Sequence, residues 1–263
     1  MSKLKKLIMM VNASSDDSWS SKYLTIEALE DDLTVSFSIN PCQYSLNGTD
    51  WVDLSANTTT PAISSGEKIC FKAEGLTPGR GGIGTFTVSK PFNLSGTVMS
   101  MLFGDEAEGK TDLTGYASAF VSLFLGTPVV NVSSNFLPAT TLESWCYNGM
   151  FANCKSLVNT PELPATSLTE CCYRYMFHGC TSLFKSPELP ATTLAALCYQ
   201  NMFYDCTSLN YIKMLATDIS ANSCLKEWVS NVSPTGTFVK SKDATWNVTG
   251  VSGIPVGWAV ETV

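Results

Sequence analysis

The chain has 263 residues, of which 44% are hydrophobic and 15% are charged, and its net charge at pH 7 is −7. The hydrophobic content is enough for a folded core and excludes global disorder. The basic residues are scattered apart from Lys3, Lys5 and Lys6, so no basic stripe is present for binding the phosphates of nucleic acid. Because no apolar run approaches the ~18 residues of a membrane-spanning helix, we predict neither a nucleic acid partner nor membrane insertion.

Residues 1–20 are predicted to form a polar N-terminal arm. The three lysines precede an apolar run at Leu7–Val11, which is shorter than the roughly 7–15 apolar residues of a secretion signal. We therefore expect a protein that leaves the ribosome as a soluble cytosolic chain without a signal peptide. A location outside the cell then requires another route, such as assembly into a particle.

Residues 21–90 are predicted to form an all-β, sandwich-like module. Short segments in which apolar and polar residues alternate, such as Leu33–Ile39 and Thr85–Val88, are typical of half-buried strands. The dipeptide Asn47-Gly48 predicts a hairpin turn, because both residues tolerate the positive φ that such a turn needs.

A 21-residue sequence, L-P-A-T-[ST]-L-x3-C-Y-x2-M-F-x2-C-[KT]-S-L, occurs three times with a period of 26 residues, at Leu137–Leu157, Leu163–Leu183 and Leu189–Leu209. Such a period indicates stacked repeats, in which one unit cannot bury its apolar face alone. Degenerate copies on both sides serve as caps and bring the predicted solenoid to about five rungs over residues 91–231. Residues 232–263 are predicted to form a C-terminal cap that seals the last rung.

Each rung is predicted to contain a short strand followed by a helix of about two turns. Leu157 and Leu163 share one side of the extended segment. Cys172, Met176 and Cys180 are spaced i, i+4 and i+8, which is typical of a helical stripe that faces a core. The predicted fold class is therefore α+β, with an N-terminal all-β sandwich-like module followed by a short strand–helix solenoid.

Met176–Leu183 reads M-F-H-G-C-T-S-L, and Pro187–Pro190 reads P-E-L-P. These segments resemble the BspA-like leucine-rich repeats, whose units read roughly A-F-x2-C-x-S-L followed by a proline-bearing strand. The resemblance implies a right-handed leucine-rich-repeat solenoid on surface or adhesion proteins of gut anaerobes, or on proteins of the phages that infect them. Bacterial members usually carry an export signal, so its absence here and the short array favour a phage protein.

The outward side of the strand carries the candidate binding residues. We place Glu162 and Glu188, one period apart, on this side, with Phe136 and Met214 in the flanking rungs. Two carboxylates one rung apart repel each other, so a cation or a basic partner can pair with them, or both can stay solvated. Concave faces of solenoids are their usual binding surfaces.

Three slots of the predicted helix vary while the rest of the unit is copied. They hold Asn148, Arg174 and Gln200, then Gly149, Tyr175 and Asn201, and then Ala152, His178 and Tyr204. Variation inside a copied unit indicates solvent exposure and a candidate contact surface. His178 is the single histidine of the chain, and without a nucleophile and an orienting partner in the sequence we interpret it as a surface residue rather than a catalytic base.

Seven of the ten cysteines fall into two repeat columns, Cys146/172/198/224 and Cys154/180/206. Their C-x7-C spacing without a paired histidine does not fit a zinc site. Disulfides between adjacent rungs are the alternative to free thiols, but parallel Cβ vectors about 4.8 Å apart exceed the roughly 3.8 Å that a bridge prefers. We predict reduced core thiols, no metal and no cofactor.

These patterns predict a non-enzymatic binding or structural protein, most simply a phage virion component of the head or tail. The arm and the β module would bind other virion proteins, and the repeats would face outward to bind a protein or glycan on the host surface. Oligomerisation is compatible with this arrangement. The alternative is a bacterial cell-surface adhesin with BspA-like repeats, and a third hypothesis is an enzyme or inhibitor built on the β module.

Overall fold

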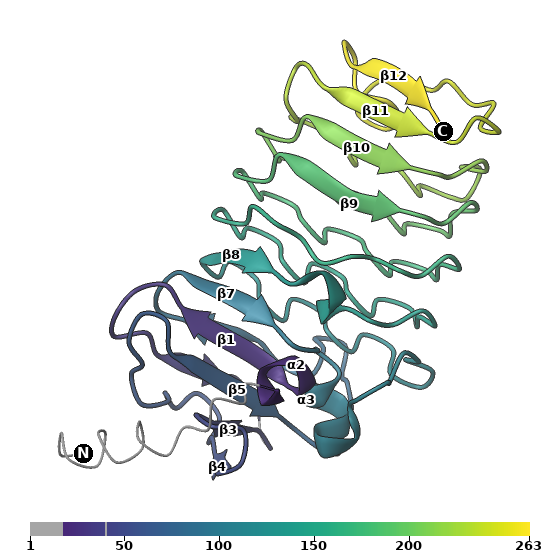
Figure 1. The fold of residues 1–263 in the computed structure, drawn as a ribbon. Coiled ribbons are helices and arrows are strands. Elements are labelled where there is room, and N and C mark those ends of the chain that lie inside the picture. The colour runs from purple at the N-terminus through teal and green to yellow at the C-terminus, as the bar shows by residue number, and fades with distance from the viewer. Residues whose placement is uncertain (1–17, 40) are drawn as a thin grey trace.

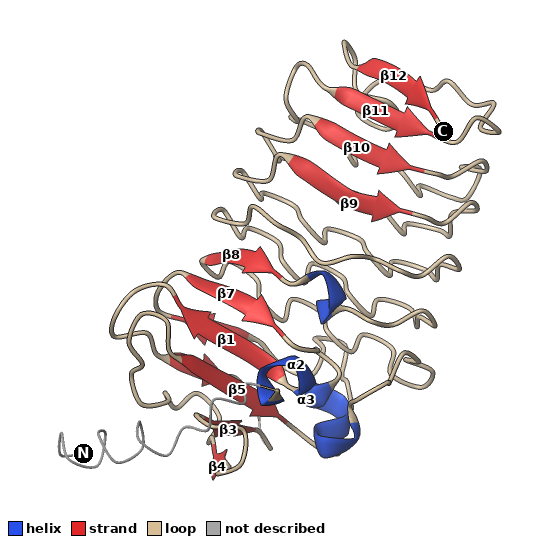
Figure 2. Cartoon of the chain, viewed as in Figure 1, coloured by secondary structure: helices blue, strands red, loops and turns tan. Residues whose placement is uncertain are grey.

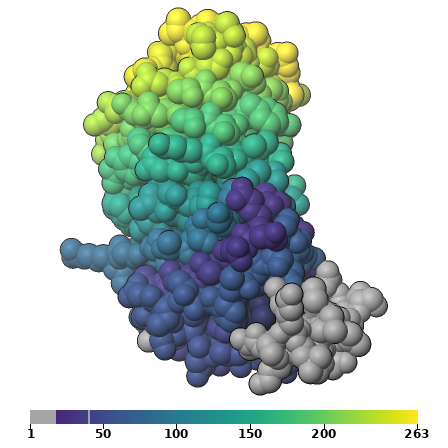
Figure 3. All heavy atoms as spheres, turned by 90° about the vertical axis from the view of Figure 1, so that its left-hand side faces the viewer, coloured from purple at the N-terminus to yellow at the C-terminus, as the bar shows by residue number. Residues whose placement is uncertain are grey.

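The computed structural model describes residues 18–39 and 41–263 as an elongated stack (Figure 1). The C-terminal rung lies at the end of the stack farthest from β1, and the space-filling view shows the rungs as successive bands in chain order (Figure 3). Most of the predicted N-terminal arm lies outside the described residues. Its last residues enter the short helix α2 (Trp19–Lys22).

The N-terminal part is built on a mixed six-stranded sheet with the order β4-β3-β5-β1-β7-β8. Its strands are β1 (Leu24–Ala28), β3 (Gln43–Ser45), β4 (Val52–Asp53), β5 (Lys68–Lys72), β7 (Phe92–Ser95) and β8 (Val129–Val132). A second sheet pairs β2 (Val35–Phe37) with β6 (Phe86–Val88) in antiparallel register. Short helical segments follow β7 and β8, namely α3 (Ser100–Phe103), η1 (Gly104–Glu106) and η2 (Ser134–Phe136).

The main sheet runs from the N-terminal part into the repeats without a break. Strand β7 pairs with β1 in antiparallel register, with Leu94 opposite Ile26, and with β8 in parallel register, with Leu94 opposite Val132. All three side chains are buried. The change from antiparallel to parallel pairing at β7 marks the start of the stack, and the N-terminal strands cover the edge that its first rung would otherwise expose.

The upper rungs form a parallel sheet with the order β12-β11-β10-β9. Its strands are β9 (Lys185–Leu189), β10 (Tyr211–Met214), β11 (Thr237–Lys240) and β12 (Ala259–Thr262). The rung between β8 and β9 has no assigned strand, but the N–H of Val158 still donates to the carbonyl oxygen of Val130 at 2.8 Å. The repeats therefore stack as a parallel β-solenoid, which confirms the predicted stacking.

The side of each rung opposite the strands is a run of tight turns, drawn as loop in Figure 2. The backbone hydrogen bonds of this side alternate along the chain. One N–H donates to a carbonyl oxygen of its own rung, and the following N–H donates to a carbonyl oxygen of the next rung. The N–H of Cys146 donates to the carbonyl oxygen of Glu143 at 3.3 Å, whereas the N–H of Tyr147 donates to that of Cys172, one rung on, at 3.0 Å. We call this side the turn face, and its bonds form a second ladder between the rungs.

The predicted α+β class, a sandwich-like module followed by a strand–helix leucine-rich-repeat solenoid, is wrong. In the described parts of the chain, the α-helices are four-residue segments outside the three clean repeats. In the turn face every fourth residue has a positive φ, as at Trp145 (65°), Gly149 (61°) and Asn153 (61°), whereas a helix keeps φ near −63° throughout. A four-residue turn repeat returns side chains to one side at i, i+4 and i+8. It therefore produces the same spacing as the core-facing stripe of a helix.

Two columns of stacked aromatic rings run through the core between the strands and the turn face. The first contains Phe86, Phe124, Phe151, Phe177, Phe203 and Trp228, with ring centres 5.2–6.0 Å apart. The second contains Phe120, Tyr147, Tyr173, Tyr199 and Trp228, with ring centres 5.6–6.4 Å apart. Both columns end on Trp228, and the first begins on β6, so one aromatic core joins the N-terminal part to the last repeats.

Candidate functional site

The structure places two of the four predicted contact residues in the core. Phe136 and Met214 are fully buried, at 0% exposure, whereas Glu162 and Glu188 are exposed. The outward orientation predicted for Phe136 and Met214 is therefore wrong, and neither side chain is accessible to a partner.

A one-residue difference in register explains Met214. Strands β9 and β10 pair Glu188 with Lys213 and Leu189 with Met214, after an irregularity between Tyr211 and Lys213. Equivalent positions are here 25 residues apart (213 − 188 = 25) rather than 26. A shift of one residue moves a strand side chain to the opposite face of the sheet, so Met214 faces inward beside Leu189.

Phe136 lies one 26-residue period before Glu162, but the backbone pairing there skips it. It lies in η2, where its carbonyl oxygen accepts a bond from the N–H of Val98 at 3.1 Å. The N–H of Glu162 donates instead to the carbonyl oxygen of Ser134 at 2.9 Å. Ser134, and not Phe136, is therefore the neighbour of Glu162 in the rung below.

The outward neighbour of Glu188 is a cation. The Nζ of Lys213 lies 2.8 Å from Oε2 of Glu188, and this hydrogen bond raises the pKa of Lys213 above its ordinary value. Both side chains are partly exposed, so the pair contributes little to stability. Its effect is to neutralise the carboxylate that the sequence suggested as a ligand for a basic partner.

A ladder of amide side chains crosses the strand face at its lower end. Asn93, Asn131 and Asn159 occupy neighbouring rungs, with Nδ2-to-Oδ1 distances of 2.8 Å from Asn131 to Asn93 and 2.6 Å from Asn159 to Asn131. The Nδ2 of Asn93 donates to Glu27 at 3.2 Å. Because each amide is already hydrogen-bonded to the next, the ladder holds the strands in register and leaves few groups for a ligand.

The cysteine columns are structural. All ten cysteines are free and buried, and Cys154, Cys180 and Cys206 donate their thiols to carbonyl oxygens of the rung below at 3.0–3.1 Å. Thr127, which stands at the cysteine position of the first degenerate copy, donates its hydroxyl to the same carbonyl of Phe124 at 2.9 Å. The column therefore selects a small side chain that can donate one hydrogen bond.

Burial makes these thiols poor nucleophiles, which gives a direct prediction. Desolvation raises the pKa of Cys146 to about 12 and that of Cys154 to about 11, so almost no thiolate exists at about pH 8. We expect iodoacetamide to leave the native protein unmodified and to add to all ten cysteines in guanidinium chloride without reductant, as counted by intact-mass spectrometry. Fewer adducts without reductant than with it would show that cysteines pair.

The turn face carries a cluster of aromatic and cationic side chains that we call the aromatic patch: Trp145, Arg174, Tyr175, His178 and Tyr204. The guanidinium carbon of Arg174 lies 5.5 Å from the ring centre of Trp145 and 4.8 Å from that of Tyr175. The His178 ring lies 5.7 Å from Tyr175, edge to face, and 5.1 Å from Tyr204, nearly parallel. Three rungs thus contribute to one continuous row.

Two nitrogens in the aromatic patch have no hydrogen-bond partner. Nε of Arg174 and Nδ1 of His178 are buried and unpaired, although both side chains are partly exposed. Buried polar atoms are normally satisfied. Both nitrogens are themselves shielded from solvent, although they lie in partly exposed side chains.

The sequence located the members of the aromatic patch only in part. Arg174, Tyr175, His178 and Tyr204 occupy the variable slots, which the structure places on the turn face, but the sequence did not show that they meet. Trp145 was missed, because it lies directly before Cys146, the first constant cysteine of the repeat, and outside those slots. The signal that would have found it is the four-residue turn repeat, which places Trp145 in the same positive-φ row as Gly149, the slot that Tyr175 fills one rung on.

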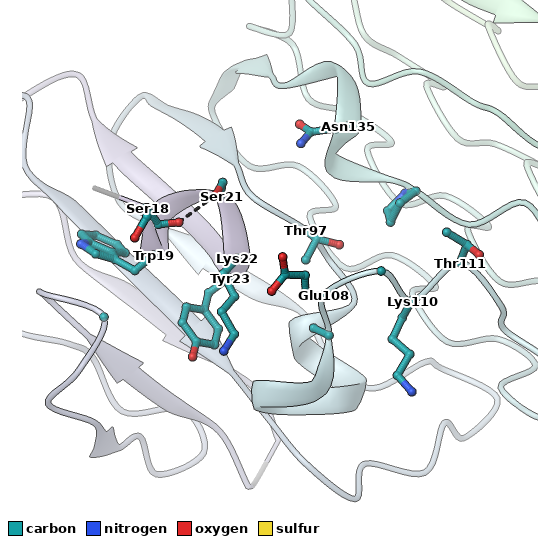
Figure 4. A pocket seen from close by; sticks show the side chains of 14 residues that line it. Ser18, Trp19, Ser21, Lys22, Tyr23, Thr97, Glu108, Lys110, Thr111 and Asn135 are labelled. Atoms are coloured by element: carbon teal, nitrogen blue, oxygen red, sulfur yellow. Dashed lines mark hydrogen bonds between the residues drawn. The ribbon is translucent and has the colours of Figure 1, made fainter. Parts of the chain in front are cut away.

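An open pocket of about 570 Å³ lies between α2 and the segment 107–111 (Figure 4). Its charged lining consists of Lys22, Glu108 and Lys110, and Figure 4 shows Lys110 directed away from the other two. The hydroxyl of Ser21 donates to the backbone of Ser18 at 2.7 Å. No histidine lies among the residues that line the pocket.

The described residues contain no group of three side chains that could hold a metal ion. Within the same ranges, no helix is long and apolar enough to cross a bilayer. Comparisons with protein-family models, with curated proteins and with solved structures find no match to this chain.

Proposed function

We propose that this chain is a non-enzymatic attachment component of a phage particle, with its N-terminal part bound to neighbouring virion proteins and its repeats facing outward. The observation that supports the binding role is the difference between the constant and the variable positions of the repeat. The constant cysteine, tyrosine, methionine and phenylalanine positions are buried. Of the slots that change from rung to rung, Arg174, Tyr175, His178 and Tyr204 are partly exposed on the turn face, whereas Gly149, Ala152, Gln200 and Asn201 are buried, contrary to the exposure expected for all of them. A repeat unit that keeps its core residues and varies a few other positions is typical of a scaffold that presents a recognition surface.

The rigid construction of the stack supports the same proposal. Two backbone ladders and two aromatic columns hold successive rungs in fixed relation, so a surface made from three rungs keeps its shape without a ligand. A preorganised surface binds with a smaller entropic cost than a mobile one. The resemblance to BspA-like repeats supports a place on a particle or cell surface.

An adsorption experiment tests this proposal. We expect mass spectrometry to detect the chain in purified particles of the phage that encodes it, and we expect the purified chain to slow adsorption of those particles to host cells. A matched control variant carries the substitutions Arg174→Asn and His178→Ala, which introduce the residues found in the same slots of the adjacent rung. We expect this variant to fold but not to slow adsorption of the particles. Absence from particles, or recovery from the surface of uninfected cells, would replace the proposal with the adhesin alternative.

A further inference from the structure

We propose that the aromatic patch binds an extended acidic polysaccharide through its carboxylate groups, an inference that rests on the proposed attachment function and names its ligand class. Trp145 is 37% exposed, and Tyr175, His178 and Tyr204 are partly exposed. Aromatic faces offer large apolar area together with polar edges, which suits the C–H faces and hydroxyl groups of sugar rings.

The shape of the aromatic patch favours a polymer over a small molecule. Successive members lie 5.5, 4.8, 5.7 and 5.1 Å apart, in the order Trp145, Arg174, Tyr175, His178 and Tyr204. They form a row across three rungs on an outer face, whereas small-molecule sites are concave and enclose most of their ligand. A chain of sugar rings can follow such a row and contact several members at once.

Arg174 gives the aromatic patch its selectivity for acid groups. None of the ion pairs between described residues includes Arg174, and its Nε has no partner. Its one hydrogen bond within the patch, from NH2 to the hydroxyl of Tyr175, is long at 3.4 Å. A guanidinium binds a carboxylate through two parallel hydrogen bonds, so an acidic sugar would pair with the charge of Arg174.

The surroundings disfavour a protein partner. A stable protein interface needs an apolar centre within an area of about 1,200–2,000 Å². Trp145 is the one large side chain of the aromatic patch among the exposed large hydrophobics of the described residues. The net charge of −7 repels a polyanion at long range, but physiological salt screens this repulsion beyond roughly 8 Å and leaves the contact with Arg174 intact.

Affinity electrophoresis and calorimetry with defined polymers test the inference. The probes are polygalacturonate, alginate, hyaluronan and polysialic acid, and the neutral control is fully methyl-esterified polygalacturonate. We expect binding to at least one acidic polymer and, for the matched ester pair, a preference of about tenfold or more for the acid, because hydrogen bonds to charged groups are the stronger ones. We expect Arg174→Gln to remove this preference for the acid. Lys226→Gln removes one positive charge from the same slot two rungs later, and we expect it to leave the preference unchanged.

The outcomes separate the inference from the proposed function. Equal binding of the acid and its ester, or equal loss with Arg174→Gln and Lys226→Gln, would overturn the role of Arg174 and leave the attachment function standing. Failure of every polymer to bind, while the purified chain still slows particle adsorption, would overturn the polysaccharide inference alone. Failure of the chain to compete for adsorption would overturn the proposed function itself.

Discussion

Replacing Trp228 with alanine is expected to lower the free energy of unfolding by about 3–5 kcal/mol. Trp228 is 0% exposed and is the residue on which both aromatic columns end, with ring centres 6.4 Å from Tyr199 and 6.0 Å from Phe203. Its indole N–H donates to the carbonyl oxygen of Gly253 at 2.8 Å. The substitution therefore opens a cavity, ends both columns one ring early and leaves a carbonyl of the C-terminal cap unpaired.

Urea unfolding followed by circular dichroism measures this effect, with Phe184→Ala as its control. Phe184 is 45% exposed, so its truncation should change stability by less than about 0.5 kcal/mol. Because each repeat contacts only its neighbours, hydrogen exchange should also show loss of protection first in β11 and β12. A Trp228→Ala protein as stable as the Phe184→Ala protein would show that the columns do not couple the cap to the repeats.

The sequence predicted the stacking of the repeats because the buried apolar positions are copied from rung to rung. The cysteine, methionine and phenylalanine columns recur with a constant period, and each column is buried against itself in the next rung. The helix was wrong because side-chain spacing alone does not distinguish 3.6 residues per turn from a four-residue turn repeat over nine residues. Glycine, asparagine and aspartate recur at the positive-φ positions, as at Gly149, Asn153 and Asp205, and these residues favour turns over helix interiors.

The binding face was harder to predict, because it depends on register and on contacts between rungs. Extending a 26-residue period past the clean repeats assigned Met214 to the wrong side, since a strand reverses its faces after a shift of one residue. The aromatic patch joins residues of three rungs. His178 and Tyr204 are one 26-residue period apart, but Trp145 and Tyr175 are 30 residues apart, so the period alone does not bring all five residues together. The variable slots showed which residues are free to change, and the backbone conformation of the turn face determined which of them meet.

Tyr175→Gly is expected to weaken polysaccharide binding by about tenfold or more while leaving the free energy of unfolding within about 1 kcal/mol of the original. The ring of Tyr175 contacts both Arg174 and His178, so its removal divides the aromatic patch into two parts and loses a stacking face. Glycine relieves the strain of the positive φ at this position but adds entropy to the unfolded chain, and the two effects nearly cancel.

Leu197→Gly provides the matched control for this prediction. Leu197 has a φ of 58°, in the same four-residue turn repeat and the same range as Tyr175, but it belongs to none of the ring or cation contacts of the aromatic patch. We expect Leu197→Gly to change stability as Tyr175→Gly does and to leave affinity for the acidic polymer unchanged, as measured by calorimetry on the same preparations. Equal losses of affinity in both variants would show that the turn backbone, rather than the tyrosine ring, limits binding, and the aromatic patch would then lose its role as the contact surface.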